Sequence, residues 1–501
     1  MMEIKKQVFN PYLPLNYCIP DGEPHVFGDR VYVYGSHDKE GGDAFCTLDY
    51  EVFSAPITDL TDWRCEGTSY RKIQDPMHSE KYRDMYAPDV VRGNDGRFYL
   101  YYALAGGCFT GPIHVAVSEN PEGPFSWYGC VRNQDGSDFT RKITFDPGIM
   151  NDNGTIRLYF GWSLAVDPDI LRGIQAQGND ELEKMLLQAQ VQMFEKKEEE
   201  IKNEPDGIMG AFMVELADDM LTVKTEPVMI IPGQFGAADT EFEGHAFFEA
   251  SSIRKINGLY YFIYSSQVCH ELCYATSKYP DRDFVYGGVI ISNGDIGYEG
   301  RSSQERLAMT GNNHGSIECI NGQWYIFYHR HTHKTAFSRQ GCAEKITILP
   351  DGSIPQVQMT SCGLNGKPLL AKGSYPAVIA CNLTNGNISH IDKGIQIEHV
   401  PFITNEGEER FIADIDDGTL IGYKYFSFTG PIRLILQIRG IAEGSFQVIA
   451  DETLVGKIPV SGNGEWIHTE TTITVDGTKA LYLKYYGTGE VQLKEIIFES
   501  V

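Results

Sequence analysis

Five segments of the chain share one pattern, a polar turn that contains glycine followed by a run of aromatic and β-branched residues. They are VFGDRVYVYGSHD (26–38), VRGNDGRFYLYYAL (91–104), IMNDNGTIRLYFGWS (149–163), IRKINGLYYFIYSS (253–266) and IECINGQWYIFYHR (317–330). Asn-Gly and Asp-Gly turns between such runs are the strongest short signal for a β-hairpin. The repeat therefore predicts five similar units, each built from strands joined by tight turns.

The spacing of the turns sets the architecture. The turn glycines Gly28, Gly96, Gly154, Gly258 and Gly322 are separated by 68, 58, 104 and 64 residues. We predict that a helical insertion at about 165–207 lengthens the third interval, with one helix over 179–203 capped by Asn179 or Asp180. The apolar face of that helix is predicted to contain Leu182, Met185, Leu186, Ala189 and Met193. Five units of about 60 residues predict an all-β, five-bladed β-propeller, and the alternative is a β-sandwich with chance hairpins.

A polar residue stands at the head of each unit, seven to nine residues before the turn glycine. These residues are Asp21, Asp89, Asp146, Glu249 and His314. Because the first strand of each propeller blade lines the central channel, equivalent positions converge on the axis. The sequence therefore predicts four carboxylates and a histidine around one pocket.

Carboxylates gathered in a partly dry pocket acquire different pKa values, so that one carboxyl can act as an acid and another as a base. Glu249 follows Phe247 and Phe248 and suits a protonated general acid. Asp21 lies among polar residues and suits an ionised base. A carboxyl pair that faces an uncharged, aromatic-lined pocket indicates glycoside hydrolysis.

The composition agrees with an uncharged ligand. The net charge of −26 argues against nucleic acid and anionic membrane surfaces as partners, and 28 Tyr, 26 Phe and 5 Trp offer faces for stacking. No run of about 18 apolar residues predicts a membrane span. Scattered cysteines without a CxxC pair, and an N-terminus without an apolar signal-like run, lead us to expect a cytoplasmic protein.

The stretches NPYLPLNYCIPDGEPHVFGDRVYVYGSHD, MYAPDVVRGNDGRFYLYYA, ITFDPGIMNDNGTIRLYF, FFEASSIRKINGLYYFIYS and NNHGSIECINGQWYIFYHR resemble glycoside hydrolase family 43 in order and spacing, over most of residues 8–345. The resemblance implies a five-bladed propeller that cleaves arabinose- and xylose-containing glycans with inversion. It implies that Asp21 is the general base, Glu249 the general acid and Asp146 the residue that orients the acid. It also implies that His314 helps to hold a metal ion, usually Ca²⁺, on the propeller axis.

The resemblance also suggests substrate-binding residues. Asp89 matches the Asp of an APD block and is expected to support the site, and Arg339 resembles an arginine that contacts substrate, with a surface arginine as the alternative. Trp162 is either a sugar-stacking residue or part of the core. The chain reads EASS where the family often has an EGPH-like block, and Glu23 in DGEPH competes with Asp21 for the role of base.

Two further motifs allow more than one interpretation. His329, His331 and His333 in HRHTH lie on one side of a predicted strand, where a zinc site is less expected than a polar pocket rim. The inserted helix is interpreted as a packing helix, with a lid or an oligomer contact as alternatives.

The pattern changes after about residue 368. We therefore divide the chain into a propeller over 1–368 and a β-sandwich, jelly-roll-like domain over 369–501. The second domain resembles a carbohydrate-binding module of family 6, with Tyr423 and Trp466 as the aromatic pair, but the late Asn of that family has no counterpart. A packing or dimerisation domain is therefore favoured, and Glu398 is a candidate ligand for a structural calcium ion.

The sequence thus predicts a glycosidase of the β-xylosidase or α-L-arabinofuranosidase type that removes terminal pentose residues from short plant-cell-wall oligosaccharides. The alternatives are a galactosidase or arabinanase on the same propeller and a non-catalytic glycan-binding propeller. No organic cofactor is expected.

Overall fold

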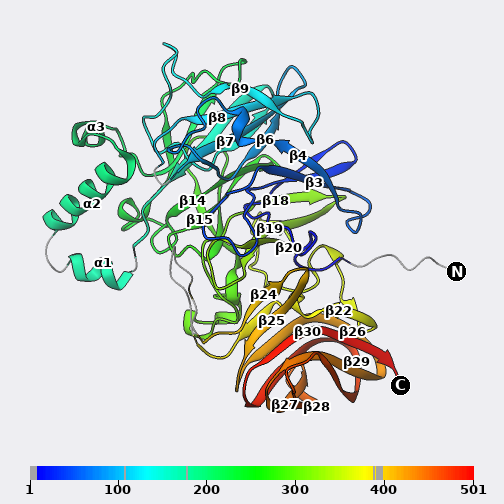
Figure 1. Ribbon diagram of the computed structural model, residues 1–501. Coiled ribbons are helices and arrows are strands. Elements are labelled where there is room, and N and C mark those ends of the chain that lie inside the picture. Colours follow the sequence, from blue (N-terminus) through cyan, green and yellow to red (C-terminus); the bar gives the residue numbers. More distant parts are fainter. Residues whose placement is uncertain (1–7, 107–108, 167, 176–178, 388–389, 391–398) are drawn as a thin grey trace.

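The computed structural model describes residues 8–106, 109–166, 168–175, 179–387, 390 and 399–501 (Figure 1). Glu398 lies outside these residues. No helix in the described ranges combines the length and the apolar character needed to cross a membrane.

Five separate antiparallel sheets form the propeller, which confirms the predicted fold class. The first sheet contains β1 (Glu23–Phe27), β2 (Arg30–Tyr34), β3 (Tyr50–Pro56) and β4 (Arg64–Tyr70), and the second β5 (Asp84–Met85), β6 (Asp89–Arg92), β7 (Phe98–Ala105), β8 (Ile113–Ser118) and β9 (Ser126–Cys130). The third contains β10 (Gly148–Asp152), β11 (Thr155–Trp162), β12 (Gly210–Leu216) and β13 (Val228–Pro232). The fourth contains β14 (Phe247–Ile256), β15 (Leu259–Ser266), β16 (Glu271–Ser277) and β17 (Val285–Ser292), and the fifth β18 (Ile317–Ile320), β19 (Gln323–His331) and β20 (Arg339–Ile346).

The repeated turns form because asparagine and glycine tolerate a left-handed backbone. In the fourth blade Asn257 and Gly258 have φ of 50° and 85°, and Ile256 pairs with Leu259 on either side of them. This two-residue loop matches the right-handed twist of the strands that it joins.

The ring closes where the first and fifth blades meet. Gly22 and Gly315 form a parallel bridge just ahead of β1 and β18. On the outer side, the Asn10 side chain donates hydrogen bonds to the Ala343 carbonyl (3.0 Å) and to Glu344 Oε1 (2.9 Å), so that the first described residues lie along β20. The residues at the heads of the blades are thereby brought around one axis.

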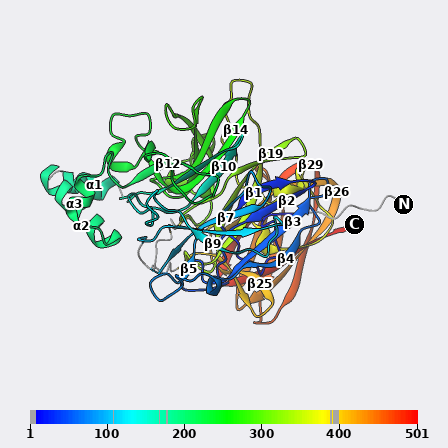
Figure 2. The same ribbon diagram turned by 90° about the horizontal axis from the view of Figure 1, so that it is seen from above.

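The insertion between β11 and β12 forms three helices rather than one. These are α1 (Pro168–Gln175), α2 (Asn179–Phe194) and α3 (Glu198–Lys202), and they project from one side of the propeller (Figures 1 and 2). Glu195, with φ of 50°, ends α2, so the single helix predicted over 179–203 is wrong. The predicted capping side chains of Asn179 and Asp180 lie outside the part of the structure that is described.

The predicted apolar face of α2 is confirmed at Met193, which packs against the propeller, and wrong at Met185. Met185 is 43% exposed, whereas Leu187, Val191 and Phe194 pack against the propeller. Among the described side chains of α2, those that pack in this apolar cluster lie in its C-terminal half, and the face buried there points at Trp162, whose ring lies 5.8 Å from that of Phe194.

The C-terminal part forms one large sheet. Its strands are β21 (Leu369–Leu370), β22 (Gly373–Pro376), β23 (Asn382–Thr384), β24 (Phe402–Glu406), β25 (Glu409–Ile415), β26 (Leu420–Gly440), β27 (Glu443–Ala450), β28 (Thr453–Ser461), β29 (Ile467–Thr488) and β30 (Val491–Ser500). The long strands β26 and β29 pair along most of their length, and β26 changes its other partner from β23 and β21 to β30. The sheet therefore wraps around a single apolar core (Figure 1).

Buried polar contacts join this domain to the propeller. Lys424 Nζ lies 2.7 Å from Asp295 Oδ2, and both side chains are almost fully buried. The Arg330 guanidinium donates to the carbonyl oxygens of Ala380 (2.9 Å) and Val378 (2.6 Å). These contacts hold the C-terminal domain against the fourth and fifth blades.

Candidate active site

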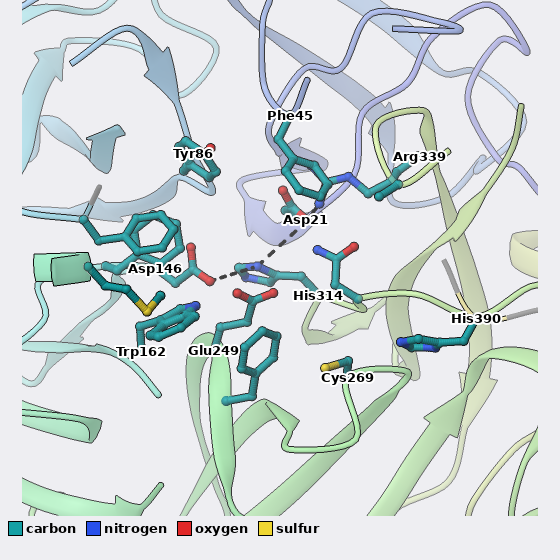
Figure 3. A pocket seen from close by; sticks show the side chains of 16 residues that line it. Asp21, Phe45, Tyr86, Asp146, Trp162, Glu249, Cys269, His314, Arg339 and His390 are labelled. Carbon is teal, nitrogen blue, oxygen red and sulfur yellow. Dashed lines mark hydrogen bonds and ion pairs between the residues drawn. The ribbon is translucent and has the colours of Figure 1, made fainter. Parts of the chain in front are cut away.

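A pocket of about 300 Å³ opens at the axis of the propeller (Figure 3). It is lined by Asp21, Phe45, Tyr86, Phe109, Phe145, Asp146, Trp162, Met193, Phe248, Glu249, Cys269, Asn312, His314, Ala336, Arg339 and His390. The structure thus brings together six of the seven predicted site residues, and only Asp89 is missing from the pocket wall.

Asp21 is held as an anion by buried cationic and hydrogen-bonding groups. Arg339 Nη1 donates to Asp21 Oδ1 at 2.9 Å, and His329 Nδ1 lies 3.3 Å from the same oxygen. Burial alone would raise the pKa of Asp21, but Arg339 and His329 hold it well below its usual range. The depressed pKa keeps Asp21 ionised at neutral pH, which is the form that a general base requires.

Arg339 is itself fixed by a second carboxylate. Its Nε and Nη2 donate to Asp38 at 2.8 and 3.1 Å, and its guanidinium lies 4.7 Å from the centre of the Phe45 ring. The side chain is only 3% exposed, so the surface arginine considered from the sequence is excluded. Arg339 acts on the pocket by setting the charge and position of Asp21.

Glu249 is aimed into the pocket by an irregular strand. The register of β14 against β15 shifts on both sides of Glu249, and Ala250 has φ of 71°. Such a bulge redirects one side chain out of the regular alternation. The EASS sequence therefore builds the local kink that presents Glu249.

The surroundings of Glu249 favour its protonated form. Burial and the negative charge of Asp21 raise the pKa of Glu249 to about 7, although Arg339 and hydrogen bonds from Asn312 and Trp162 oppose the shift. At neutral pH a large share of Glu249 therefore carries the proton that a general acid must donate.

Asp146 lies beside Glu249 and supports its backbone. Asp146 Oδ2 accepts a hydrogen bond from the Ala250 amide at 3.0 Å, next to the acid in the chain. Burial, with the charges of Glu249 and Asp21, raises the pKa of Asp146 well above its usual value. Asp146 and Glu249 therefore oppose each other's ionisation, which helps to retain a proton on the pair.

His314 faces the two aspartates, as Figure 3 shows. Its Nδ1 lies 3.5 Å from Asp146 Oδ2 and 3.9 Å from Asp21 Oδ1, and burial lowers the pKa of His314 to about 4. Calcium prefers six to eight oxygen ligands. Here the donors are one imidazole nitrogen and two carboxylates, one of them already neutralised by Arg339, so this set fits Ca²⁺ poorly and the metal stays a prediction.

Aromatic side chains form the rest of the wall. The Trp162 ring lies 5.6 Å from that of Phe109 and 5.7 Å from that of Phe248, and it is 7% exposed. Trp162 thus belongs both to the local core and to the pocket wall, and its stacking on a sugar stays a prediction. Met193, from the end of α2, completes this wall.

Asp89 and Glu23 lie outside the pocket. Asp89 is 1% exposed, accepts a hydrogen bond from the Ile149 amide (2.7 Å) and pairs with His25 (2.6 Å), so it supports neighbouring strands and does not reach a substrate. Glu23 forms an ion pair with Arg254 at 2.7 Å. The structure therefore favours Asp21 over Glu23 as the base.

The three histidines of HRHTH do not converge on one point. His329 Nε2 and His331 Nε2 lie 2.8 and 2.9 Å from the Asn312 carbonyl, whereas His333 Nε2 lies 2.9 Å from Asn405 Oδ1. The zinc hypothesis for this motif is therefore not supported, and His329 instead supports Asp21.

Sequence reasoning missed several residues of the site. Asp38 and Phe45 come from the loop after β2, Tyr86 lies three residues before Asp89, and Asn312 two residues before His314. Asn312 Oδ1 is buried without a partner among the described residues. Because Tyr86 and Asn312 lie so close to predicted axial residues, their place in the site could have been predicted from the sequence. No sequence pattern indicated that Asp38 belongs to the site.

The predicted sugar-binding pair of the C-terminal domain is not supported. Tyr423 is fully buried and donates its hydroxyl to the Ala377 carbonyl at 3.0 Å. Trp466 packs against Phe411, with Arg439 over its ring at 4.6 Å. The resemblance to a family 6 module is therefore not confirmed.

Comparisons with known proteins agree with the geometry. The family described as "Glycosyl hydrolases family 43" matches residues 15–202 and 193–354. A xylosidase/arabinosidase of Thermoclostridium stercorarium is 43% identical over 507 residues, which cover 98% of each chain. A xylosidase/arabinosidase of Bacteroides ovatus is 30% identical over 64% of this chain and 87% of its own.

A solved structure shows a similar fold. The GH43_1 enzyme from Xanthomonas citri complexed with xylotriose is 25% identical, with a TM-score of 0.50, over 72% of this chain and 96% of its own.

Proposed function

The chain belongs to glycosyl hydrolase family 43, and we propose that it removes terminal xylose or arabinofuranose residues from short oligosaccharides with inversion of the anomeric centre. The observation that carries this proposal is the opposite charge preference of two carboxyls in one pocket. Asp21 is stabilised as an anion, and Glu249 has a pKa of about 7.

In the proposed reaction Glu249 gives its proton to the glycosidic oxygen as the bond from that oxygen to the anomeric carbon breaks. Asp21 accepts a proton from a water molecule, whose oxygen forms the new bond on the opposite face of the sugar. Asp146 holds the backbone at Ala250 and thereby keeps Glu249 in position. The resting state returns when Glu249 regains a proton and Asp21 loses one.

The shape and lining of the pocket support a small, uncharged substrate. A cavity of about 300 Å³ with aromatic walls suits stacking against one sugar ring, and the buried Asn312 Oδ1 is available to accept a hydroxyl hydrogen bond. The two xylosidase/arabinosidase relatives act on substrates of this kind according to their names.

The direct test is hydrolysis of nitrophenyl β-xyloside and α-L-arabinofuranoside, with β-galactosides and arabinan as comparison substrates. Proton NMR of the first product should show the anomer opposite to that of the substrate. Retention of configuration, or preference for galactosides or internal arabinan bonds, would overturn the proposal.

We also propose a cellular compartment, an oligomeric contact and a calcium site for this protein. Cys269 apart, the cysteines that the structure describes are free thiols, which supports a reducing, cytoplasmic compartment. Self-association through the C-terminal domain or the inserted helices is tested by light scattering. Calcium at His314 is tested by activity after exhaustive chelation.

A further inference from the structure

Three potential metal ligands meet at one end of the fourth blade. His245 lies four residues before Glu249, and Glu271 and Cys273 lie on the same face of β16 because residues two apart in a strand point the same way. One ligand atom from each of the three residues lies within 4.8 Å of the others. None of the three lines the active-site pocket.

The contacts converge on one carboxylate oxygen. Glu271 Oε1 lies 2.7 Å from His245 Nδ1, 2.6 Å from Ser266 Oγ and 3.3 Å from Cys273 Sγ. Glu271 and Cys273 are buried, whereas the His245 side chain is 37% exposed. The cluster is thus closed on its inner side and open to solvent at the imidazole.

The imidazole is held in one orientation. The Tyr286 ring is stacked on the His245 ring, with centroids 4.9 Å apart and an angle of 14° between the planes. The Tyr286 hydroxyl lies 3.9 Å from Cys273 Sγ, so the same residue covers two of the three groups. A ligand set that is oriented before binding loses less freedom when the metal arrives.

We propose that His245, Glu271 and Cys273 bind a divalent transition-metal ion of the zinc class. One nitrogen, one oxygen and one sulfur ligand suit Zn²⁺, whereas Ca²⁺ and Mg²⁺ select oxygen ligands. Coordination would release the thiol proton of Cys273 to solvent as the sulfur–metal bond forms. The imidazole of His245 would likewise give up its Nδ1 proton to solvent and carry hydrogen only on Nε2, so that the Nδ1 lone pair binds the metal. Water would be the fourth ligand.

The geometry requires only a small adjustment. Ligand atoms around a tetrahedral zinc ion lie roughly 3.3–3.6 Å apart, given metal–ligand bonds of about 2.0–2.3 Å. The sulfur–oxygen distance of 3.3 Å already meets this spacing, and the nitrogen–oxygen distance of 2.7 Å must widen. A small slide of the partly exposed His245 ring, parallel to the Tyr286 ring, supplies that movement and keeps the stacked orientation.

The site would join two segments that lead to the pocket. His245 lies four residues before Glu249 in the chain. Cys269, which lines the pocket, lies two residues before Glu271. A bound ion would therefore clamp these segments together and stabilise the fourth blade without touching the substrate.

The test uses the metal-free full chain, titrated with ZnCl₂ in a calorimeter, and with CoCl₂ to detect the charge-transfer absorption of a cobalt–thiolate bond. Variants Cys273→Ser and His245→Gln are compared with Cys319→Ser and His468→Gln, a thiol and an exposed imidazole outside the cluster. Substitution of the buried Cys273 can disturb folding. His245 is partly exposed, so His245→Gln tests the site in a protein that keeps its fold.

We expect about one metal ion per chain, a melting temperature that rises with zinc concentration, and a cobalt–thiolate band. Both cluster variants should lose affinity by at least about 10–100-fold, the loss seen when even a supporting partner of a metal site is removed. Unchanged zinc affinity in both cluster variants, or no thiolate band, would overturn the proposal. Equal losses in the two control variants would do so too.

Discussion

At the scale of single residues, Arg339 separates the behaviour of two nearby carboxyls. It pairs directly with Asp21 and is held by Asp38, so its charge is concentrated on the proposed base. Arg339 stabilises the anionic form of Glu249 less than that of Asp21. Glu249 also lies among apolar groups, so burial raises its pKa to about 7. One buried cation therefore creates an acid and a base from the same functional group.

The pH dependence of activity follows from these two carboxyls. Because Glu249 acts in its protonated form, kcat/KM should fall as the pH rises through about 7. Because Asp21 acts as an anion and its pKa is depressed, the acidic limb should lie below the usual carboxyl range. The measurement is kcat/KM against pH for the wild type and Glu249→Gln, in which the basic limb should disappear.

The leaving group provides the control for that assignment. Glu249→Gln should reduce turnover by about 10²–10⁴ on substrates with a poor leaving group and much less on a dinitrophenyl glycoside. Equal losses on both substrates would contradict the role of Glu249 as the acid.

The backbone of Ala250 is strained, and this conformation belongs to the kink that presents Glu249 to the pocket. The φ of 71° at Ala250 is costly for a residue with a Cβ atom. Ala250→Gly should therefore raise the free energy of unfolding by up to about 1 kcal/mol, part of the gain being offset by the freer unfolded chain. Denaturant unfolding measures this change. Ala275→Gly in β16, where φ is not positive, should instead destabilise the protein.

At the scale of elements, the end of α2 decides how the inserted helices affect function. Phe194 is buried against Trp162, and the adjacent Met193 reaches the pocket wall. The insertion therefore contributes part of the substrate pocket as well as packing against the propeller.

Met193→Ala should weaken substrate binding while leaving the fold intact. Loss of roughly 1 kcal/mol of apolar contact corresponds to about fivefold in kcat/KM, expressed mainly in KM. Kinetics on nitrophenyl xyloside and xylotriose measure the effect. Met185→Ala on the exposed face of the same helix is the matched control and should match the wild type. An equal loss in both variants would contradict a pocket role for Met193.

At the scale of the whole molecule, the C-terminal domain is part of the folded unit. The buried pair of Lys424 and Asp295 crosses the boundary, and Arg330 from the propeller binds C-terminal backbone carbonyls. Separation of the domains would leave these charged groups without partners. We therefore expect the two domains to unfold together.

Lys424→Met tests this coupling. Removal of one partner from a buried ion pair leaves an uncompensated charge and costs about 3–5 kcal/mol. Denaturant unfolding should show the loss as one transition moved to lower denaturant. Arg433→Ala, which breaks a solvent-exposed pair with Glu499, should scarcely change the midpoint. Two separated transitions in the wild type would contradict joint unfolding.

The sequence by itself determined the repeat, the number of blades and the residues at their heads. These features are local, because an Asn-Gly turn and an alternating strand depend on residues a few positions apart. The shared offset from the turn glycine was therefore enough to place Asp21, Asp146 and Glu249 on one axis. Their charge preferences could be anticipated only in outline, from polar or apolar neighbours.

Only the tertiary structure decided the partners of these residues. The contacts of Arg339 with Asp38 and Asp21, of α2 with Trp162, and of Lys424 with Asp295 join positions far apart in the chain. Such contacts depend on how the blades close and the domains dock, and a local pattern carries no information about those distances. Six residues of the pocket wall could be predicted from the sequence, whereas the pocket's electrostatics depended on the packing.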